Sequence, residues 1–582
     1  MVNVARGKPM AEAAVVGTRT PEQVVEPRTE RETTRTVRGL PVIYLVLMAV
    51  VTVAGFLLRW PSFGDSLSGD EISTFYIVNG HSLSRVLSLV YSGQESTPPL
   101  YFVLAWLTKG WFGTAHMAQG IRLVSLVTGV AAIPLTFVLG LLTVGRRAAL
   151  VGAVCVACSP FMIIFSTEAR TYMLVLFLGL VSSICLLRAI DTNRLAWWAG
   201  YAVSCCAAVY SHYSVVFFLV AQFAWAFFAA PRARKSLILA NVAVVAGFLP
   251  AIGGLRAGLR DTNFISTLVP VNLTDIGNIL ERFWIGPATF PVNKVPGNVA
   301  VLLAVAGLAV AVLGLAFAAR KRRARWRPTP GLALIVVLAL APAVLMILYS
   351  WLRTDVLGGG NIIASWPAMA LAIGALVTAP RAPVRIVAVT LVVVAYVIGG
   401  VKMLSPAWQR GDVHGALAYI ERTGKSGDPI VSLPAFANPL SEVDAALAGT
   451  PNYTYVPGNT LDRERTVVSG DAHPVIRLYY PPLQEQFNHL AGPRPAPAFF
   501  FANVPSGQQV AQEAISAARH DTVFMVTPFP NRVWARNSSV TIVRQFFDAM
   551  ALHHYHVATQ VQIKSYALFS SGETVLIFRK SS

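Results

Sequence analysis

Long apolar runs dominate the first 400 positions of this chain of 582 residues. Many of them hold about eighteen or more residues, the length that a helix needs to cross roughly 30 Å of hydrocarbon. Short polar segments separate the runs, and several of these segments are strongly basic. The pattern predicts eleven membrane-spanning helices, at residues 41–58, 123–144, 148–165, 172–187, 197–210, 214–230, 237–255, 299–319, 332–351, 362–379 and 386–401.

The basic segments give these helices a direction across the membrane. Arg31, Arg35 and Arg38 precede the first run, and the basic cluster 320–323 follows the eighth. Because Lys and Arg collect in cytoplasmic loops, we expect the N-terminus in the cytoplasm and the C-terminus outside. We therefore predict a multi-pass protein of the plasma membrane, with residues 1–38 as a disordered cytoplasmic tail and residues 39–403 as the membrane domain.

The segment between the first two predicted spans is too long for a simple connection. Within it, residues 98–107 are apolar but too few to cross a bilayer comfortably. The aromatic side chains of Tyr101, Trp106 and Trp111 suit a helix that lies in the membrane interface. We expect juxtamembrane helices in this first outer loop.

The composition changes at about residue 404. Apolar runs shrink to strand length and helical patterns stand between several of them, which predicts an extracytoplasmic α/β domain over residues 404–582. The expected strands are 429–433, 475–480, 498–502, 522–527, 561–569 and 574–578, and the expected helices are 413–422, 508–519 and 541–553. No phosphate-binding glycine motif follows these strands, so nucleotide binding is not expected.

The net charge of +19 does not indicate a nucleic-acid partner. With only 13% charged residues and 55% hydrophobic ones, the chain is a membrane protein. The positive-inside rule accounts for its excess of basic residues. The lipid bilayer, and not a nucleic acid, is therefore the expected partner of this protein.

Two clusters of ionisable residues stand at the outer ends of predicted spans. One is the pair Asp70 and Glu71, and the other is Glu168 with Arg170. Such groups are costly beside hydrocarbon unless they have partners, so they are candidates for function. Glycosyl transfer from a polyprenyl-phosphate sugar fits this pattern, because the donor keeps its lipid in the bilayer and its sugar at the interface.

That reaction needs a base and a cation. A carboxylate deprotonates the acceptor hydroxyl, and a guanidinium binds the phosphate and stabilises the charge that builds on it. We assign Asp70 as the base and Arg170, with Arg122, as the phosphate clamp. A single displacement would invert the anomeric centre.

Several short motifs occur in an order typical of one family. They are Gly69-Asp70-Glu71, residues 96–101, Ile121-Arg122-Leu123, residues 159–161, residues 166–172 and residues 210–213. Over roughly residues 40–400 the chain resembles family 39-type GT-C integral-membrane glycosyltransferases, related to protein mannosyltransferases and the aminoarabinose transferase of lipid A. The resemblance implies a GT-C fold, a catalytic acidic pair in the first outer loop and a juxtamembrane helix near 98–111.

The residues and the resemblance together predict a site with three groups of side chains. The catalytic group is Asp70, Glu71 and Glu168; the donor phosphate group is Arg170, Arg122, Tyr172 and Arg353; the substrate-binding group is Glu95, His212, Tyr213 and Asn361. Two positions depart from many relatives. Thr97 stands where a His is common, and Gly360-Asn361 stands where an Arg-Tyr pair is common.

The sequence requires no cofactor, although it leaves room for a divalent cation. His212 with Glu95 or Glu168 is a poor zinc set, because zinc usually takes three or four protein ligands. We therefore assign no metal ligand and expect His212 to act as a hydrogen-bonding residue. The run His553-His554-Tyr555-His556 is interpreted as a helix end, since adjacent histidines point in different directions around a helix.

The main alternative is a transporter or flippase of a lipid-linked sugar. Such a protein would place polar residues at mid-bilayer in interrupted helices and would often show internal repeats, whereas the acids here stand at span ends. The Ala-, Val- and Arg-rich composition is compatible with a high-GC actinobacterium, which favours mannose or arabinose as the sugar. The acceptor is left open between a cell-envelope glycan, a glycolipid and a protein.

Overall fold

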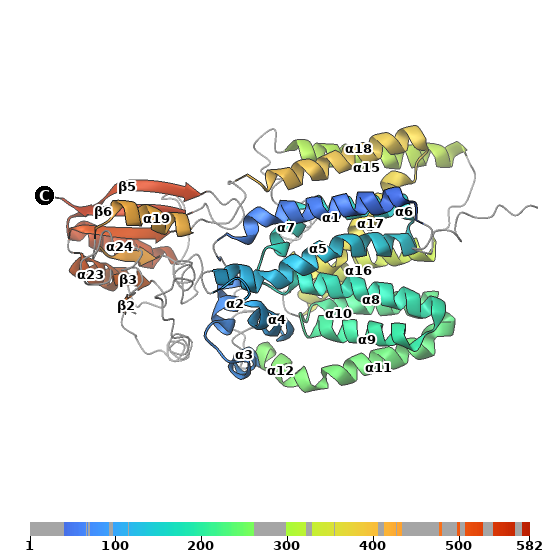
Figure 1. The fold of residues 1–582 in the computed structure, drawn as a ribbon, viewed down its shortest axis with the longest axis horizontal. Helices are drawn as coiled ribbons and strands as arrows, with labels where there is room; N and C mark the ends of the chain where they lie inside the picture. The colour runs from blue at the N-terminus through green and yellow to red at the C-terminus, as the bar shows by residue number, and fades with distance from the viewer. Residues whose placement is uncertain are drawn as a thin grey trace, which may run out of the picture.

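The structure is a computed structural model of the whole chain. It describes residues 40–65, 67, 70–91, 97–113, 116–260, 298–321, 329–353, 356–405, 413–425, 428–432, 477–479, 497–500, 507–518, 520–527, 539–564 and 573–581. The predicted cytoplasmic tail lies outside these residues. A bundle of long helices forms one part of the molecule, and an α/β unit lies at one end of it (Figure 1).

The helical part begins with α1 and ends with α18. Its helices are α1 (Val42–Phe63), α2 (Asp70–Val78), α3 (Leu83–Leu89), α4 (Leu100–Thr108), α5 (Met117–Thr143), α6 (Arg146–Cys158), α7 (Pro160–Ser166), α8 (Tyr172–Thr192), α9 (Leu195–Val209), α10 (Val215–Ala229), α11 (Arg234–Phe248), α12 (Ile252–Arg260), α15 (Asn298–Lys321), α16 (Pro330–Leu352), α17 (Trp366–Thr378) and α18 (Ala382–Lys402). A 3-10 turn, Gly360–Ser365, leads into α17.

The fold class predicted from the apolar runs is confirmed. Among the described residues, eight helices are long and apolar enough to cross a membrane, or up to nine if the bent pair α6 and α7 counts as one span. The shorter apolar helices α9 and α10 occupy two further predicted spans. One predicted span is broken, because Pro160 interrupts it with a bend of 59° between α6 and α7. The predicted span that contains Pro250 stays continuous, although this residue lies in a short 3-10 turn between α11 and α12.

Three short helices, α2 to α4, fill the predicted juxtamembrane segment. The apolar run near residue 100 forms α4, which has nine residues and is too short to span. Lys109, just after α4, donates from Nζ to Val78 O at 2.7 Å, and Trp106 Nε1 donates to His81 O at 2.8 Å. The end of α4 is thus fixed to the end of α2.

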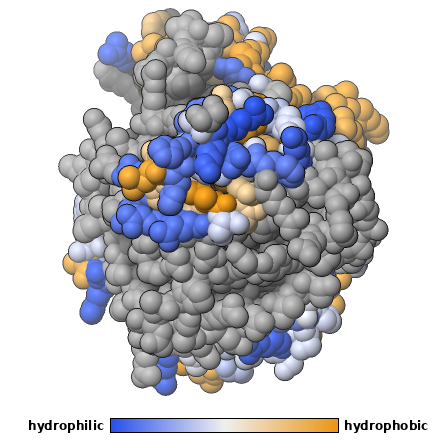
Figure 2. All heavy atoms as spheres, turned by 90° about the vertical axis from the view of Figure 1, so that its left-hand side faces the viewer, coloured by the Kyte–Doolittle hydropathy of each residue, from blue (hydrophilic) through white to orange (hydrophobic). Residues whose placement is uncertain are grey.

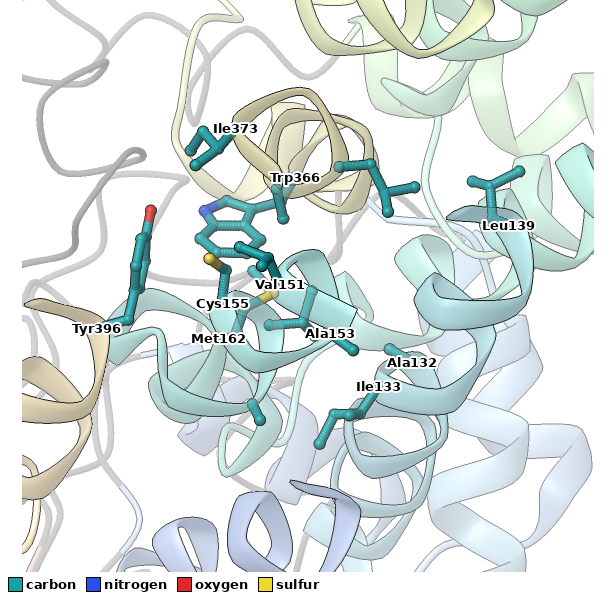
Figure 3. Packing of buried hydrophobic residues seen from close by; sticks show 14 of the residues in the cluster. Ala132, Ile133, Leu139, Val151, Ala153, Cys155, Met162, Trp366, Ile373 and Tyr396 are labelled. Carbon is teal, nitrogen blue, oxygen red and sulfur yellow. The ribbon is translucent and has the colours of Figure 1, made fainter. Parts of the chain in front are cut away.

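The largest core cluster lies where α5, α6, α7, α17 and α18 meet. Trp366 is fully buried there beside Cys155, Met162 and Tyr396 (Figure 3). Helix backbones come close through glycine: a Cβ at Gly374 would lie 2.4 Å from Ala148 O. Small residues at helix contacts are typical of membrane bundles, where van der Waals packing replaces the hydrophobic effect.

The α/β unit holds a six-stranded sheet of order β2-β3-β1-β4-β6-β5. The strands are β1 (Ile430–Ser432), β2 (Arg477–Tyr479), β3 (Pro497–Phe500), β4 (Thr522–Thr527), β5 (Tyr555–Lys564) and β6 (Glu573–Lys580), and the helices are α19 (Val413–Thr423), α23 (Gly507–Ala517) and α24 (Ser539–Leu552). Strand β1 is parallel to β3 and β4, whereas β6 is antiparallel to β4 and β5. Hydrophilic side chains surround a small apolar patch at this end of the molecule (Figure 2).

The elements of this unit lie close to their predicted positions, with one clear difference. Strand β5 begins at Tyr555, six residues before the predicted start of its apolar run. Helix α24 ends at Leu552, and His554 takes a positive φ of 66° that turns the chain. The histidine run is therefore a helix end, as predicted, but His556 already belongs to the strand.

Candidate active site

Two segments predicted to carry the chemistry are joined by hydrogen bonds. Helix α7 ends at Ser166 and α8 begins at Tyr172, so residues 167–171 form a turn between them. Both main-chain groups of Ala169 in this turn bind α2: its N–H donates to Glu71 Oε1 at 2.7 Å, and its carbonyl accepts from Thr74 Oγ1 at 2.7 Å. Asp70 begins α2 beside Glu71, and Arg170 follows Ala169.

Glu71 and Arg122 form a bidentate ion pair with both side chains fully buried. Arg122 Nε lies 2.6 Å from Glu71 Oε1, and Arg122 Nη2 lies 2.7 Å from Glu71 Oε2. Arg122 Nη1 also donates to the carbonyl of Phe63, the last residue of α1, and to that of Asp65 just after it. A buried charge pair needs such complete hydrogen bonding to offset its loss of hydration. These contacts fix α2, α5 and the end of α1 to one another.

The main chain of Arg170 is held from α5. Its carbonyl accepts from Ser125 Oγ at 3.0 Å, and its N–H donates to Glu168 O at 2.7 Å. Ser125 Oγ in turn lies 3.0 Å from the hydroxyl of Tyr101. Burial raises the pKa of this hydroxyl above its usual value. The Arg170 side chain is 6% exposed, whereas Glu168 is partly exposed.

A second set of predicted residues lies on the other side of the turn. Thr171 Oγ1 donates to Ser211 O at 2.8 Å, which ties the turn to the loop between α9 and α10. In this loop, the ring of His212 lies 5.7 Å from the ring of Tyr172. His212 Nδ1 accepts from Ser214 N–H at 3.2 Å, which puts the proton of the neutral ring on Nε2.

Asn361 completes this side of the site. Its main-chain carbonyl accepts from Ser214 Oγ at 3.0 Å, and its side-chain Nδ2 donates to Val356 O at 2.8 Å. The neighbouring Gly360 packs directly on Tyr172, because a Cβ there would lie 2.5 Å from Tyr172 Cε1. The ring of Tyr172 thus fills the space beside the position where many relatives carry an Arg.

The other predicted residues are less closely tied to the turn. Arg353 is exposed just after α16, and Tyr213 packs its ring 6.2 Å from that of Phe248. Glu95 and the side chain of Asp70 lie outside the described part of the chain. Within that part, no group of three or more His, Cys, Asp and Glu side chains could hold a metal ion.

Some residues of the site were not predicted from the sequence. Thr74 and Ser125 stand three positions after Glu71 and Arg122, so each shares a helix face with its predicted neighbour. This three-residue spacing is a sequence signal from which Thr74 and Ser125 could have been predicted as neighbours of the site. The predicted first span ends at residue 58, but α1 continues to Phe63, so Arg59 lies inside this helix and is fully buried.

The comparisons with known proteins agree with the motif resemblance. Residues 96–252 match the family model of the dolichyl-phosphate-mannose-protein mannosyltransferases, a family of GT-C glycosyltransferases. The match covers about a quarter of the chain and includes Arg122 and the whole 167–171 turn. The resemblance stated from the sequence motifs is thereby confirmed. No curated protein sequence matches this chain.

Solved structures show a distant likeness. The archaeal oligosaccharyltransferase AglB from Archaeoglobus fulgidus, in complex with an inhibitory peptide and a dolichol-phosphate, matches at 14% identity and a TM-score of 0.41, over 66% of this chain and 58% of that chain. ArnT from Cupriavidus metallidurans bound to undecaprenyl phosphate matches at 11% identity and a TM-score of 0.44, over 92% of this chain and 97% of that chain. At these values no residue is placed by superposition.

Proposed function

We propose that this protein transfers a sugar from a polyprenyl-phosphate donor to an acceptor on the outer face of the plasma membrane. The observation that supports this most is the hydrogen bond from Ala169 N–H to Glu71 Oε1. Asp70 is the chain neighbour of Glu71, and Arg170 is the chain neighbour of Ala169, so this hydrogen bond brings the two segments that carry them together. The contact lies at the end of apolar helices that would hold the lipid. The family match of residues 96–252 gives the proposal its reaction class.

In the proposed reaction, Asp70 takes the proton of the acceptor hydroxyl as general base. The acceptor oxygen then attacks the anomeric carbon, and the bond from this carbon to the phosphate oxygen breaks. The electron pair leaves with the phosphate, whose growing charge Arg170 stabilises through paired hydrogen bonds. Attack opposite the leaving group inverts the anomeric centre.

We assign the remaining predicted residues to binding and to the frame of the site. Glu168 supplies a second carboxylate at the sugar, and Arg353 a second cation for the donor phosphate. Tyr172, His212, Tyr213, Asn361 and Glu95 contact the substrates. Because Glu71 and Arg122 bind each other so completely, we propose that they act mainly by holding α2 against the turn.

The sugar is mannose or arabinose in this proposal. The acceptor is a cell-envelope glycan, a glycolipid or a protein, and the α/β unit lies on the acceptor side. The N-terminus is cytoplasmic, and no cofactor is required. These finer assignments rest on the charge pattern and the motifs of the sequence.

The test is transfer by the purified protein in detergent. Radiolabelled polyprenyl-phosphate sugars are offered singly with a crude cell-envelope extract, and the wild type is compared with Asp70→Asn. Asp191→Asn is the matched control, since it removes an exposed acid at the end of α8 that lies farthest from the 167–171 turn. We expect transfer from one donor, lost in Asp70→Asn and retained in Asp191→Asn.

Two results would contradict the proposal. Equal transfer by Asp70→Asn would remove this residue as the base. Absence of transfer from every donor, combined with translocation of a lipid-linked sugar in proteoliposomes, would replace the transferase with a flippase.

A further inference from the structure

Arg59 is a fully buried cation inside the first membrane helix, and it binds a neighbouring helix rather than a carboxylate. Its Nη1 donates to Ala157 O at 2.9 Å and its Nη2 donates to Val156 O at 3.1 Å. Its Nε donates to Ser166 Oγ at 2.9 Å. Three donors of one guanidinium thus contact α6 and the last residue of α7.

The sequence explains why these carbonyls need donors. In a continuous helix, the carbonyl of Val156 would accept from the N–H of residue 160, but Pro160 has no N–H. Ser159 takes an extended ψ of 124°, which also removes Ala157 O from the helical pattern. In hydrocarbon an unsatisfied carbonyl is costly because no water can donate to it, and Arg59 supplies the missing donors.

Close helix packing lets Arg59 reach the break. A Cβ at Gly55, one turn before Arg59, would lie 2.4 Å from Ile133 Cδ1 and 3.2 Å from Ala157 Cβ, so α1 lies directly against α5 and α6. Arg59 Nη1 also donates to Gly55 O at 2.7 Å. The guanidinium therefore binds main-chain carbonyls of its own helix, α1, as well as those of α6.

Ser166 connects this cation to the candidate site. Its hydroxyl accepts from Arg59 and donates to Met162 O at 2.5 Å, and it lies against Gly129, where a Cβ would be 2.3 Å from the Ser166 oxygen. The next residue begins the 167–171 turn that carries Glu168 and Arg170. The direction of α7 decides where this turn lies.

We propose that Arg59 is a positioning residue: it binds the break between α6 and α7 and so sets the position of the 167–171 turn and of Arg170. The expected effect of Arg59 on sugar transfer rests on the proposed function. Its effect on the position of the 167–171 turn does not, because that position can be measured without a reaction.

The test compares Arg59→Met, Arg59→Lys and the milder Ser166→Ala with the wild type. Thr52→Val is the control, since it removes only a hydrogen bond within α1, from Thr52 Oγ1 to Met48 O. The readouts are kcat, KM for the donor, and hydrogen exchange of the amides of residues 168–172. Proteins of equal thermal stability are compared.

We expect Arg59→Met to lower kcat/KM for the donor by about tenfold or more, because small displacements of a catalytic group are costly. Arg59→Lys should restore part of this loss, since a single ammonium keeps the charge but not the fork of donors. Exchange at residues 168–172 should accelerate in Arg59→Met and, to a smaller extent, in Ser166→Ala. Thr52→Val should change neither.

Pro160→Ala gives a second, independent test. It returns an N–H to the break, so Val156 O has a helical donor and the loss of Arg59 should matter less in this background. The effects of Arg59→Met and Pro160→Ala on exchange are therefore expected to be non-additive. Additive effects, or unchanged exchange in folded Arg59→Met, would overturn the proposal. If the wild type transfers no sugar, the proposed function fails while the exchange data still decide the role of Arg59.

Discussion

One oxygen atom of Glu71 joins three parts of the candidate site. Glu71 Oε1 accepts from Ala169 N–H at 2.7 Å and from Arg122 Nε at 2.6 Å. Helix α2, helix α5 and the 167–171 turn therefore meet at one buried carboxylate. A carboxylate engaged in this way is better suited to holding its neighbours than to accepting a proton from a substrate.

The first prediction concerns the charge of this carboxylate. Glu71→Gln keeps the shape of the side chain but leaves the buried Arg122 without a counter-charge. Removing one partner of a buried ion pair typically costs about 3–5 kcal/mol, and we expect a loss of that size. The measurement is the free energy of unfolding of the purified protein in detergent, or its thermal midpoint.

The double variant Glu71→Gln, Arg122→Met serves as the control. It removes both charges, so its loss of stability should be smaller than the sum of the two single losses. A Glu71→Gln protein as stable as the wild type would show that the pair is not what holds α2 in place.

The second prediction concerns the other contact between α2 and the turn. Thr74→Val removes the hydrogen bond to Ala169 O and leaves a buried carbonyl without this donor. We expect a loss of about 1–3 kcal/mol in unfolding free energy and faster amide exchange in the turn. Thr74→Ser keeps the hydroxyl and should behave like the wild type. Identical exchange in Thr74→Val and Thr74→Ser would argue against the contact.

The spans could be predicted because they depend on local properties of the sequence. The apolar length of a run such as α8 or α16 decides whether a helix can cross the bilayer, and no distant residue is needed. Strands β4 and β6 were recognisable for a similar reason, since each is a short apolar run between polar segments. The short length of α4 was also readable locally, whereas the break at Pro160 was missed because residues 148–165 were predicted as one continuous span.

The contacts of the site could not be predicted in this way. Glu71 and Ala169 are far apart in the sequence, and their hydrogen bond depends on how α2 packs against the turn. Arg59 was misplaced because a basic residue usually marks the end of a span. Here the acceptors exposed by Pro160 keep it inside α1, and that compensation involves two helices at once.

The third prediction tests the proposed phosphate clamp. Arg170→Ala removes the guanidinium that would bind the leaving phosphate, so donor affinity and kcat should fall together, with kcat reduced about 100-fold or more. Arg170→Lys keeps a charge without bidentate geometry and should be intermediate. Retention of a radiolabelled polyprenyl phosphate and steady-state kinetics measure the two effects. Unchanged kinetics in Arg170→Ala would place the clamp elsewhere, with Arg353 as the next residue to vary.

The fourth prediction uses two nearby glycines that differ in their surroundings. A Cβ at Gly360 would lie 2.5 Å from Tyr172 Cε1, whereas a Cβ at Gly358 would meet its first neighbour, Asn361 Nδ2, at 3.4 Å. Gly360→Ala must therefore displace the Tyr172 ring, and overpacking of this kind usually costs about 1–3 kcal/mol. Gly358→Ala introduces the same methyl group without this clash.

Displacement of the Tyr172 ring should also disturb substrate binding, because this ring lies beside His212. Tyr172 also stands only two residues after Arg170 in the sequence. We expect Gly360→Ala to raise the KM for the donor, while Gly358→Ala keeps the KM of the wild type. Gly360→Ala combined with Tyr172→Leu, whose smaller side chain leaves room for the methyl group, should regain stability but not donor affinity. If Gly360→Ala alone binds donor as tightly as Gly358→Ala, Tyr172 has no part in the donor site.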